Sequence, residues 1–351
     1  MKGNKIKIGI NGLGRIGRHI FRMAALDDDI EIVLINEKIE DINNWIYTIS
    51  YDTIYGKFDA EMSIDNDFLI IDGERIRTTN KSIISDVPWH KYGVDYIVDC
   101  SGIKDNVIKS RLILDNTSVK KIFISHSPIE VDFTLILGVN EDLYDNKSHH
   151  LIASSICDAT AIAPITKLVN DNFNIVSGYV TTLHPWLSYQ NLMDGPSSSW
   201  SVPGEIYHHY ALGRSSIGNL IPKPTTAVDA VCKVIPNLNK EKIGSFSYRT
   251  PTQIVGSADL TFFVAKKITF NDILNLFKEF ERNQKYPVLK MSKEPLVSLD
   301  FVGETFSCVL DERWLNIVDK NLIKCVLWYD NEFGYASNII RQIKLIHTMI
   351  N

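Results

Sequence analysis

The chain has 351 residues, of which 45% are hydrophobic and 23% are charged, and its formal net charge is -5. This length predicts two domains rather than one core, and the composition is that of an ordinary globular protein. With no strongly basic run, nucleic acid is not expected as a partner. No apolar run is long enough to span a bilayer, so no membrane partner is expected either.

The cysteines predict the chemical environment of the protein. They are scattered and form no CxxC pair: Cys100, Cys157, Cys232, Cys308 and Cys325. This pattern argues against a disulfide framework and a zinc site, and it favours a reducing cytosol. The first residues lack the apolar core of a signal peptide, which also favours a cytoplasmic location.

A glycine-rich turn near the start predicts a nucleotide site. The apolar segment 5–10 has the pattern of a buried strand, and residues 19–25 have helical spacing. Between them lies a GxGxxG motif, in the order that dinucleotide-binding proteins require. Gly12 permits the tight turn, Gly14 lets a pyrophosphate approach the backbone, and Gly17 allows the helix to pack closely on the strand. A glycine-rich turn without a ligand is the alternative.

A second strand, 31–37, ends in an acid that bears on the choice of cofactor. Glu37 follows Gly12 by 25 residues, near the spacing at which an acid hydrogen-bonds the adenosine ribose. A carboxylate there repels a 2′-phosphate, so NAD is favoured over NADP, although Lys38 leaves that preference open.

Three further segments resemble strands of a parallel sheet: 96–100, 121–125 and 135–139. Ser101 and Ser125 follow strand ends, where a doubly wound sheet places its ligand. Ordinary turn chemistry is the alternative for both serines. The first half therefore predicts an α/β fold of the Rossmann type.

Cys157 is the candidate nucleophile. It precedes an apolar run with helical spacing, and Asp158 or Thr160 is placed to cap that helix. A thiol at a helix N-terminus has a lowered pKa and a larger thiolate fraction. A small buried apolar residue is the alternative.

A histidine is available as its partner. The segment 174–183 has the pattern of a strand and ends at His184, which is placed to accept the thiol proton or to hold a thiolate. A structural histidine is the alternative. The pair His208-His209 lacks a third ligand at a suitable spacing, so no metal site is expected.

Candidate anion-binding groups follow. The polar loop from Gly195 to Arg214 is long enough to be functional or interfacial. Thr225 opens a helical pattern, and Arg249 leaves a strand as a candidate to grip a phosphate. A helix cap and a surface ion pair are the alternatives. Segments 258–265 and 323–329 resemble strands, and an amphipathic helix ends the chain.

Taken together, these segments resemble the glyceraldehyde-3-phosphate dehydrogenase family over essentially the whole chain and in the same order. The matching motifs are Ile10 through Arg18, Tyr51-Asp52-Thr53, Leu137-Gly138-Val139-Asn140, Thr181-Thr182-Leu183-His184, Asp194-Gly195-Pro196-Ser197, Lys233-Val234-Ile235-Pro236, Glu294 through Ser298, and Trp328 through Tyr335. The resemblance implies an α/β protein with a Rossmann NAD-binding domain (1–156), an α+β catalytic domain (157–329) and a C-terminal helix that returns to the first domain (330–351).

The resemblance also implies a reaction. Cys157 attacks an aldehyde, a hydride passes to NAD, and His184 acts as acid and base. In the family inorganic phosphate then releases the thioacyl-enzyme as an acyl phosphate. The departures from the family pattern described below leave water as the alternative acceptor. The implied substrate is a phosphorylated aldehyde such as glyceraldehyde 3-phosphate, and the implied assembly is a homotetramer.

Further residues receive roles by the same resemblance. Arg15 and Ile16 match residues that line the pyrophosphate, and Glu37 stands for the ribose-binding acid. Asn331 matches the partner of the nicotinamide carboxamide, and Tyr335 the tyrosine near its ring. Ser125 is a further candidate for the cofactor, and the expected substrate-binding residues are Thr225, Arg249 and Arg214.

Departures from the family pattern surround the cysteine. Where the family has Ser-Cys-Thr-Thr-Asn-Cys, this chain has Ile156-Cys157-Asp158-Ala159-Thr160-Ala161. After His184 the family has a threonine and, two positions later, usually an aspartate or a threonine. This chain has Leu187 and Tyr189 at these two positions. A carboxylate close to a phosphate dianion costs roughly a kcal/mol or more at an effective dielectric constant of about 20. We therefore expect weak phosphate use, a different aldehyde, or both.

Two other functions are open. A dehydrogenase-derived regulatory or binding protein would keep NAD affinity without turnover, although it has no need of both Cys157 and His184. An NAD-linked alcohol dehydrogenase without covalent chemistry leaves Cys157 unexplained.

Overall fold

The computed structural model describes residues 5–196, 200–202, 205–206 and 210–350. The chain divides into two compact units. The first unit comprises Met1–Thr134, Tyr144–Ser154 and Ala336–Asn351, and the second comprises Leu135–Leu143 and Ser155–Tyr335. The second unit thus takes in residues 135–143, which lie inside the limits expected for the first domain.

The first unit contains a nine-stranded sheet. Its strands, in sheet order, are β10 (Phe133–Thr134), β11 (Leu151–Ala153), β9 (Lys121–Ile124), β8 (Tyr96–Asp99), β1 (Ile6–Asn11), β2 (Ile30–Asn36), β7 (Glu74–Thr79), β6 (Phe68–Ile71) and β5 (Met62–Asp65). Every pair from β10 to β7 is parallel, whereas β7, β6 and β5 pair antiparallel. Strands β8 and β9 are buried at every position, as expected of a parallel sheet covered on both faces.

The helices of this unit are α1 (Arg15–Ala25), α2 (Ile42–Ser50), α3 (Lys104–Asn116) and the part of α7 (Phe333–Ile350) from Ala336 onward. A two-stranded ladder joins β3 (Tyr51–Asp52) to β4 (Gly56–Lys57). The α7 segment is fixed by Lys344, whose Nζ lies 2.8 Å from Asp27 Oδ1 and 2.9 Å from Asp29 Oδ2. The predicted Rossmann fold is confirmed.

Four of the five strands predicted in the first half are found, but the prediction for 135–139 is wrong. These residues form a turn, with Gly138 at a φ of 78° and the Ile136 N–H donating to Asn140 Oδ1 at 2.9 Å. Leu135 and Leu137 are buried, so this segment is apolar because it contributes to a core and not because it joins the sheet.

The second unit contains a mixed eight-stranded sheet. Its strands, in sheet order, are β15 (Ile221–Lys223), β16 (Ile243–Thr250), β12 (Ile175–Pro185), β17 (Gly256–Val264), β21 (Leu322–Tyr329), β19 (Cys308–Asp311) and β18 (Leu289–Ser292), with β20 (Asn316–Val318) beside β21. The predicted strands 174–183, 258–265 and 323–329 correspond to β12, β17 and β21. Strand β12 pairs in parallel with β16, which places the ends of these two strands at the same edge of the sheet.

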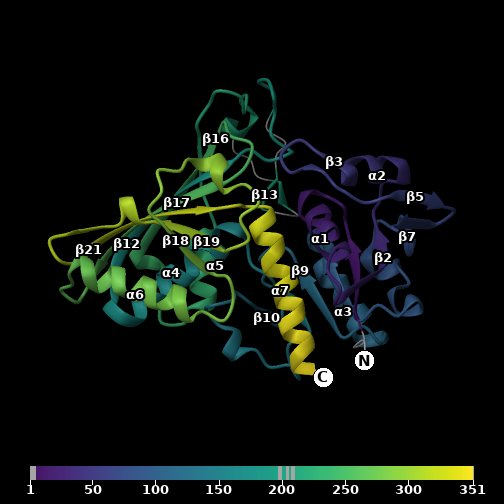
Figure 1. Ribbon diagram of the computed structural model, residues 1–351, viewed down its shortest axis with the longest axis horizontal. Coiled ribbons are helices and arrows are strands. Elements are labelled where there is room, and N and C mark those ends of the chain that lie inside the picture. The colour runs from purple at the N-terminus through teal and green to yellow at the C-terminus, as the bar shows by residue number, and fades with distance from the viewer. Residues whose placement is uncertain (1–4, 197–199, 203–204, 207–209, 351) are drawn as a thin grey trace. The chain divides into compact units, whose positions relative to one another are not determined.

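Three helices pack on one face of this sheet: α4 (Cys157–Phe173), α5 (Ala227–Val234) and α6 (Phe270–Asn283) (Figure 1). Their apolar side chains share one buried core with residues of the strands. This core includes Ile165 of α4, Val231 of α5, Phe277 of α6 and Phe262 of β17. The start of α4 is thereby anchored against the sheet that carries His184.

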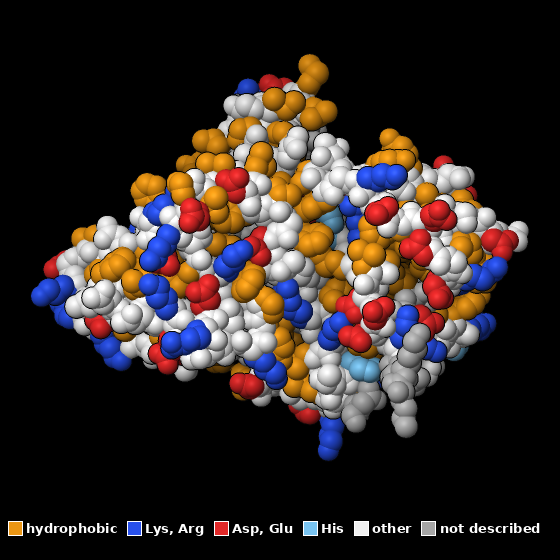
Figure 2. Space-filling view, viewed as in Figure 1, with side chains coloured by type: hydrophobic (Ala, Val, Ile, Leu, Met, Phe, Trp, Pro, Cys, Tyr) orange, Lys and Arg blue, Asp and Glu red, His pale blue; other side chains and the backbone are white. Residues whose placement is uncertain are grey.

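The remaining elements are short. They are the hairpin of β13 (Trp200–Val202) and β14 (Glu205–Ile206), and 3₁₀ turns at Ile84–Asp86, Trp89–Tyr92, Glu141–Leu143, Tyr210–Gly213, Lys240–Lys242, Ser298–Phe301 and Glu312–Trp314. In the part of the chain that the structure describes, no helix combines the length and apolarity needed to cross a membrane. On the face shown in Figure 2, basic and acidic side chains are interspersed, so that face of the described residues presents no continuous basic surface.

Candidate active site

Cys157 is the first residue of α4. The residue before it, Ile156, is extended and provides no side-chain cap. The predicted capping by Asp158 or Thr160 is therefore wrong, because both lie within the helix and the Thr160 hydroxyl donates back to Ile156 O at 3.0 Å. The chain enters α4 through Ser155, a buried residue with a φ of 63°, which turns the backbone so that Cys157 starts the helix.

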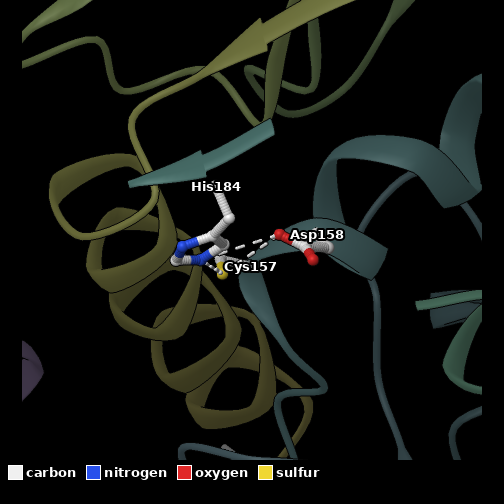
Figure 3. A group of neighbouring side chains, drawn as sticks. All are labelled: Cys157, Asp158 and His184. Carbon is white, nitrogen blue, oxygen red and sulfur yellow. Dashed lines mark hydrogen bonds and ion pairs between the residues drawn. The ribbon is translucent and has the colours of Figure 1, made fainter. Parts of the chain in front are cut away.

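Three side chains meet at this point, and we call them the Cys157 cluster: Cys157, Asp158 and His184. Figure 3 shows His184 reaching from the end of β12 toward the other two, at the start of α4. Cys157 Sγ lies 3.5 Å from His184 Nε2 and 3.6 Å from Asp158 Oδ1. Asp158 Oδ1 is 3.9 Å from His184 Nε2. The thiol therefore has two acceptors within reach.

The tautomer of His184 follows from its other ring nitrogen. Nδ1 lies 2.7 Å from the carbonyl oxygen of Pro185, and since a carbonyl only accepts, Nδ1 carries the hydrogen. Nε2 is then left with a lone pair facing Cys157. Burial, reinforced by the charge of Arg249, lowers the pKa of His184 to about 4, so the ring is neutral near pH 7 and available as a base.

The thiol of Cys157 is held in its protonated form. Burial raises its pKa well above the ordinary value, and the adjacent Asp158 carboxylate raises it further. The predicted lowering of this pKa by the helix dipole is therefore wrong, since desolvation and a like charge outweigh it. The resting pair is a neutral thiol beside a neutral imidazole.

Asp158 is fixed from the far side of the cluster. The hydroxyl of Tyr329, which is 1% exposed, donates to Asp158 Oδ1 at 2.8 Å. Burial and then the charge of Asp158 raise the pKa of Tyr329 well above its usual value, so the phenol remains a donor. Asp158 replaces a family hydroxyl with an oriented acceptor next to the nucleophile.

Arg249 is the predicted anion-binding residue whose charge acts on the Cys157 cluster. It lies opposite His184 in the β12–β16 register and is 5% exposed. Its Nη2 donates to Tyr189 Oη at 3.3 Å, and its buried Nε has no hydrogen-bond partner among the described residues. A buried guanidinium with an unused donor is suited to hold an anionic ligand.

The other predicted substrate residues have local contacts. Thr225 Oγ1 accepts a hydrogen bond from the Ala227 N–H at 3.2 Å, at the start of α5. Arg214 forms an exposed ion pair with Asp194, with Nε and Oδ2 3.0 Å apart. Their roles toward substrate stay predictions. His208 and His209 lie outside the described residues.

Lys223 is a further charged residue of this site that the sequence pattern did not predict. It lies on β15, is only 9% exposed, and donates from Nζ to Pro224 O at 2.5 Å. Burial and the charge of Arg249 lower its pKa to about 8, against the opposing effect of Asp158. Two buried cations and one carboxylate thus act on the same site, and a buried excess of positive charge favours an anionic ligand. One signal in the sequence could have predicted this position. If residues 221–223, directly before Thr225, form a strand, Lys223 lies on the same face as the apolar Ile221.

In the first unit, the glycine turn has the geometry of a nucleotide site. Gly12 has a φ of 92°, and a Cβ on Gly17 would lie 2.0 Å from Gly12 O. The fold itself therefore requires these two glycines. A Cβ on Gly14 would meet nothing within 4 Å, so the space beside it suits a pyrophosphate at the N-terminus of α1.

The neighbouring cofactor candidates surround this turn. Glu37 Oε2 accepts from the Leu13 N–H at 2.7 Å, which ties the end of β2 to the glycine turn. Arg15 is ion-paired with Asp52. Burial would raise the pKa of Asp52, but hydrogen bonds from Arg15 and two backbone N–H groups lower it to about 2. Ile16 lies in the first turn of α1, and the Ser125 N–H donates to Asp99 O at 3.0 Å.

The two remaining candidates lie in the second unit. Asn331 Oδ1 accepts from the Val255 N–H at 3.1 Å, and the Tyr335 hydroxyl donates to Ser155 O at 2.8 Å. Both are 5% exposed. Tyr335 thus holds the strained residue that precedes α4, while roles toward nicotinamide remain predicted for both.

A Rossmann unit with this glycine turn and a second unit with a paired thiol and imidazole define an NAD-dependent dehydrogenase. Residues 6–107 match the family model for the glyceraldehyde 3-phosphate dehydrogenase NAD-binding domain, and residues 156–331 match the C-terminal domain of the same family. The chain belongs to the glyceraldehyde-3-phosphate dehydrogenase family, and its cofactor is NAD.

Relatives of the chain carry the same name. It is 34% identical to a glyceraldehyde-3-phosphate dehydrogenase of Priestia megaterium, over 95% of this chain and 96% of the relative. It is 33% identical to that of Schistosoma mansoni over 98% of both chains. The identity to that of Geobacillus stearothermophilus is 33%, over 95% of this chain and 96% of the relative.

The glycine turn generates a paired test. Gly17→Ala should lower Tm by about 2–10 °C, because the new Cβ meets the Gly12 carbonyl and forces the turn to move. Gly14→Ala should leave Tm unchanged and weaken NAD binding, because its methyl group fills the open space. Thermal unfolding and calorimetric NAD titration check both variants. Unchanged NAD affinity in Gly14→Ala would mean that the pyrophosphate does not approach there.

The charge of Asp158 generates a second test. In Asp158→Thr the repulsion of the thiolate is gone, so the pKa of Cys157 falls and alkylation by iodoacetamide at neutral pH quickens. A drop of one pKa unit corresponds to roughly tenfold. Mass spectrometry should find the label on Cys157, and Cys157→Ser should lack the fast phase. A slower reaction in Asp158→Thr would show that the carboxylate serves as the base for the thiol.

Proposed function

We propose that the protein oxidises a phosphorylated aldehyde, such as glyceraldehyde 3-phosphate, with NAD through a thioacyl intermediate on Cys157. The observation that carries this proposal is the 3.5 Å approach of Cys157 Sγ to an unprotonated His184 Nε2. A nucleophile and a base at this distance suit covalent catalysis on a carbonyl group. The relatives' names supply the substrate class.

The first half of the reaction uses the Cys157–His184 pair. The thiol proton moves to Nε2 as sulfur bonds to the aldehyde carbon, and Nε2 returns the proton to the resulting alkoxide. His184 then takes the hydroxyl proton as the carbon loses a hydride and the thioester forms. NAD supplies the hydride acceptor when it is bound. His184 thus acts in turn as base, acid and base.

Phosphate and water compete as acceptors of the acyl group from the thioester. Arg249 and Lys223 favour the phosphate anion, because both are buried cations and one guanidinium donor is unused. Asp158 opposes phosphate by charge and is oriented to accept a hydrogen bond from water. In either case the leaving thiolate recovers its proton from His184.

The test measures NADH from glyceraldehyde 3-phosphate and from unphosphorylated aldehydes, with and without inorganic phosphate. We expect a burst of one NADH per chain that Cys157→Ser abolishes. Phosphate-dependent turnover identifies an acyl phosphate product, whereas turnover indifferent to phosphate identifies hydrolysis. Asp158→Thr should raise the phosphate dependence. Retained NAD binding without NADH from any aldehyde would support the alternative, a catalytically weakened homologue with a regulatory role.

We further propose that the chain acts in the cytoplasm as a homotetramer. Tyr179, Leu183 and Phe263 are large apolar residues of β12 and β17 that are 38–49% exposed, so the strands of this sheet carry apolar surface for self-association. All five cysteines are free thiols, in keeping with a reducing compartment. Sedimentation equilibrium should give about four times the chain mass of 39.8 kDa, and a stable monomer would contradict the proposal.

A further inference from the structure

We propose that the Cys157 cluster is a zinc site, at which one Zn²⁺ reversibly blocks the nucleophile and its base. Cys157, Asp158 and His184 each offer one ligand atom, and these atoms all lie within 4.8 Å of one another. Thiolate, imidazole and carboxylate are the three kinds of protein ligand that zinc takes. The sequence predicts His184 as the partner of Cys157, but the inclusion of Asp158 as a third ligand atom depends on the distances in the fold.

The distances fit a tetrahedral ion. Zn–S, Zn–N and Zn–O bonds of ordinary length give tetrahedral edges of about 3.4–3.6 Å between ligand atoms. The observed edges are 3.5 Å for Sγ to Nε2, 3.6 Å for Sγ to Oδ1 and 3.9 Å for Nε2 to Oδ1. Two edges already match, and the third closes with a movement of a few tenths of an ångström.

Hydrogen bonds already orient two of the ligands. The His184 Nδ1–H donates to Pro185 O, so the Nε2 lone pair is directed into the cluster. Metal-bound histidines ordinarily have such a carbonyl or carboxylate on the second ring nitrogen. Tyr329 does the same for Asp158 through its hydroxyl. This support reduces the reorganisation that zinc binding requires.

The proton and charge balance also favours zinc over harder cations. Binding exchanges the thiol proton for the metal, so an S–H bond is broken, an S–Zn bond forms and one H⁺ leaves. The two positive charges of the ion are then balanced by one thiolate and one carboxylate. Arg249 and Lys223 repel any cation here, and Mg²⁺ and Ca²⁺ cannot offset that repulsion because they prefer oxygen ligands.

Inhibition, which rests on the function proposed above, follows from the identity of the ligands. The sulfur that would attack an aldehyde and the lone pair that would take its proton are both bound to the ion. Removal of the metal by a chelator restores both groups. Asp158, which stands where the family pattern has threonine, supplies the third ligand.

The experiment measures zinc binding on the full chain, without turnover. After treatment with EDTA and its removal, Zn²⁺ is titrated in competition with a chromophoric chelator. We expect one tight site per chain, at least a tenfold weaker site in Asp158→Thr, and loss of the site in Cys157→Ser. Cys232→Ser is the matched control, because Cys232 is a half-buried free thiol on α5 outside the cluster, and it should bind zinc normally.

A second readout identifies the ligand. Co²⁺ in place of Zn²⁺ should give a thiolate-to-cobalt absorption band that Cys157→Ser lacks, and Mg²⁺ should not compete. Equal zinc affinity in the chain and in Asp158→Thr, or no tight site at all, would overturn the proposal. Zinc binding by a chain that oxidises no aldehyde would reject the proposed function alone. Aldehyde oxidation that zinc does not inhibit would reject the zinc site alone.

Discussion

One hydrogen bond, from His184 Nδ1 to the carbonyl of Pro185, determines what the site can do. It leaves a lone pair on Nε2, and the end of β12 directs that lone pair at the first residue of α4. With the opposite tautomer, Nε2 would be a donor facing a protonated thiol, and neither proton transfer nor metal binding would follow. The catalytic and inhibitory chemistry therefore share one structural cause.

Burial sets the second constraint. It keeps Cys157 protonated and His184 neutral, so the site rests without the ion pair that a thiolate and an imidazolium would form. Among the described residues, the charges that act on these two groups are those of Asp158, Arg249 and Lys223. Because these two cations outnumber the carboxylate, a bound anion lowers the electrostatic free energy of the site that they form with the Cys157 cluster. A bound anionic substrate or phosphate therefore neutralises the excess positive charge of the site.

The sequence predicted what local pattern encodes. The sequence predicts the GxGxxG turn, the strand before it and the helix after it, because each has a pattern that spans only a few residues. The apolar pattern of 135–139 wrongly predicts a strand, since a buried turn and a buried strand are equally apolar. Asp158 and Tyr329 meet across 171 residues, and Lys223 comes opposite Ser247, two residues before Arg249, only after β15 pairs with β16. Such contacts depend on sheet register, and the sign of the Cys157 pKa shift depends on burial, so neither was visible in the chain.

Asp158 is the residue through which these constraints act together. As a family hydroxyl it would donate to an incoming anion, whereas as a carboxylate it accepts from Tyr329, repels a thiolate and offers a bond to a metal. It therefore lowers the reactivity of the resting thiol while it supplies a ligand that a threonine would not. Lys223, whose charged form Asp158 favours, partly offsets the charge of Asp158. The change at position 158 therefore alters the local charge pattern as well as removing a family hydroxyl.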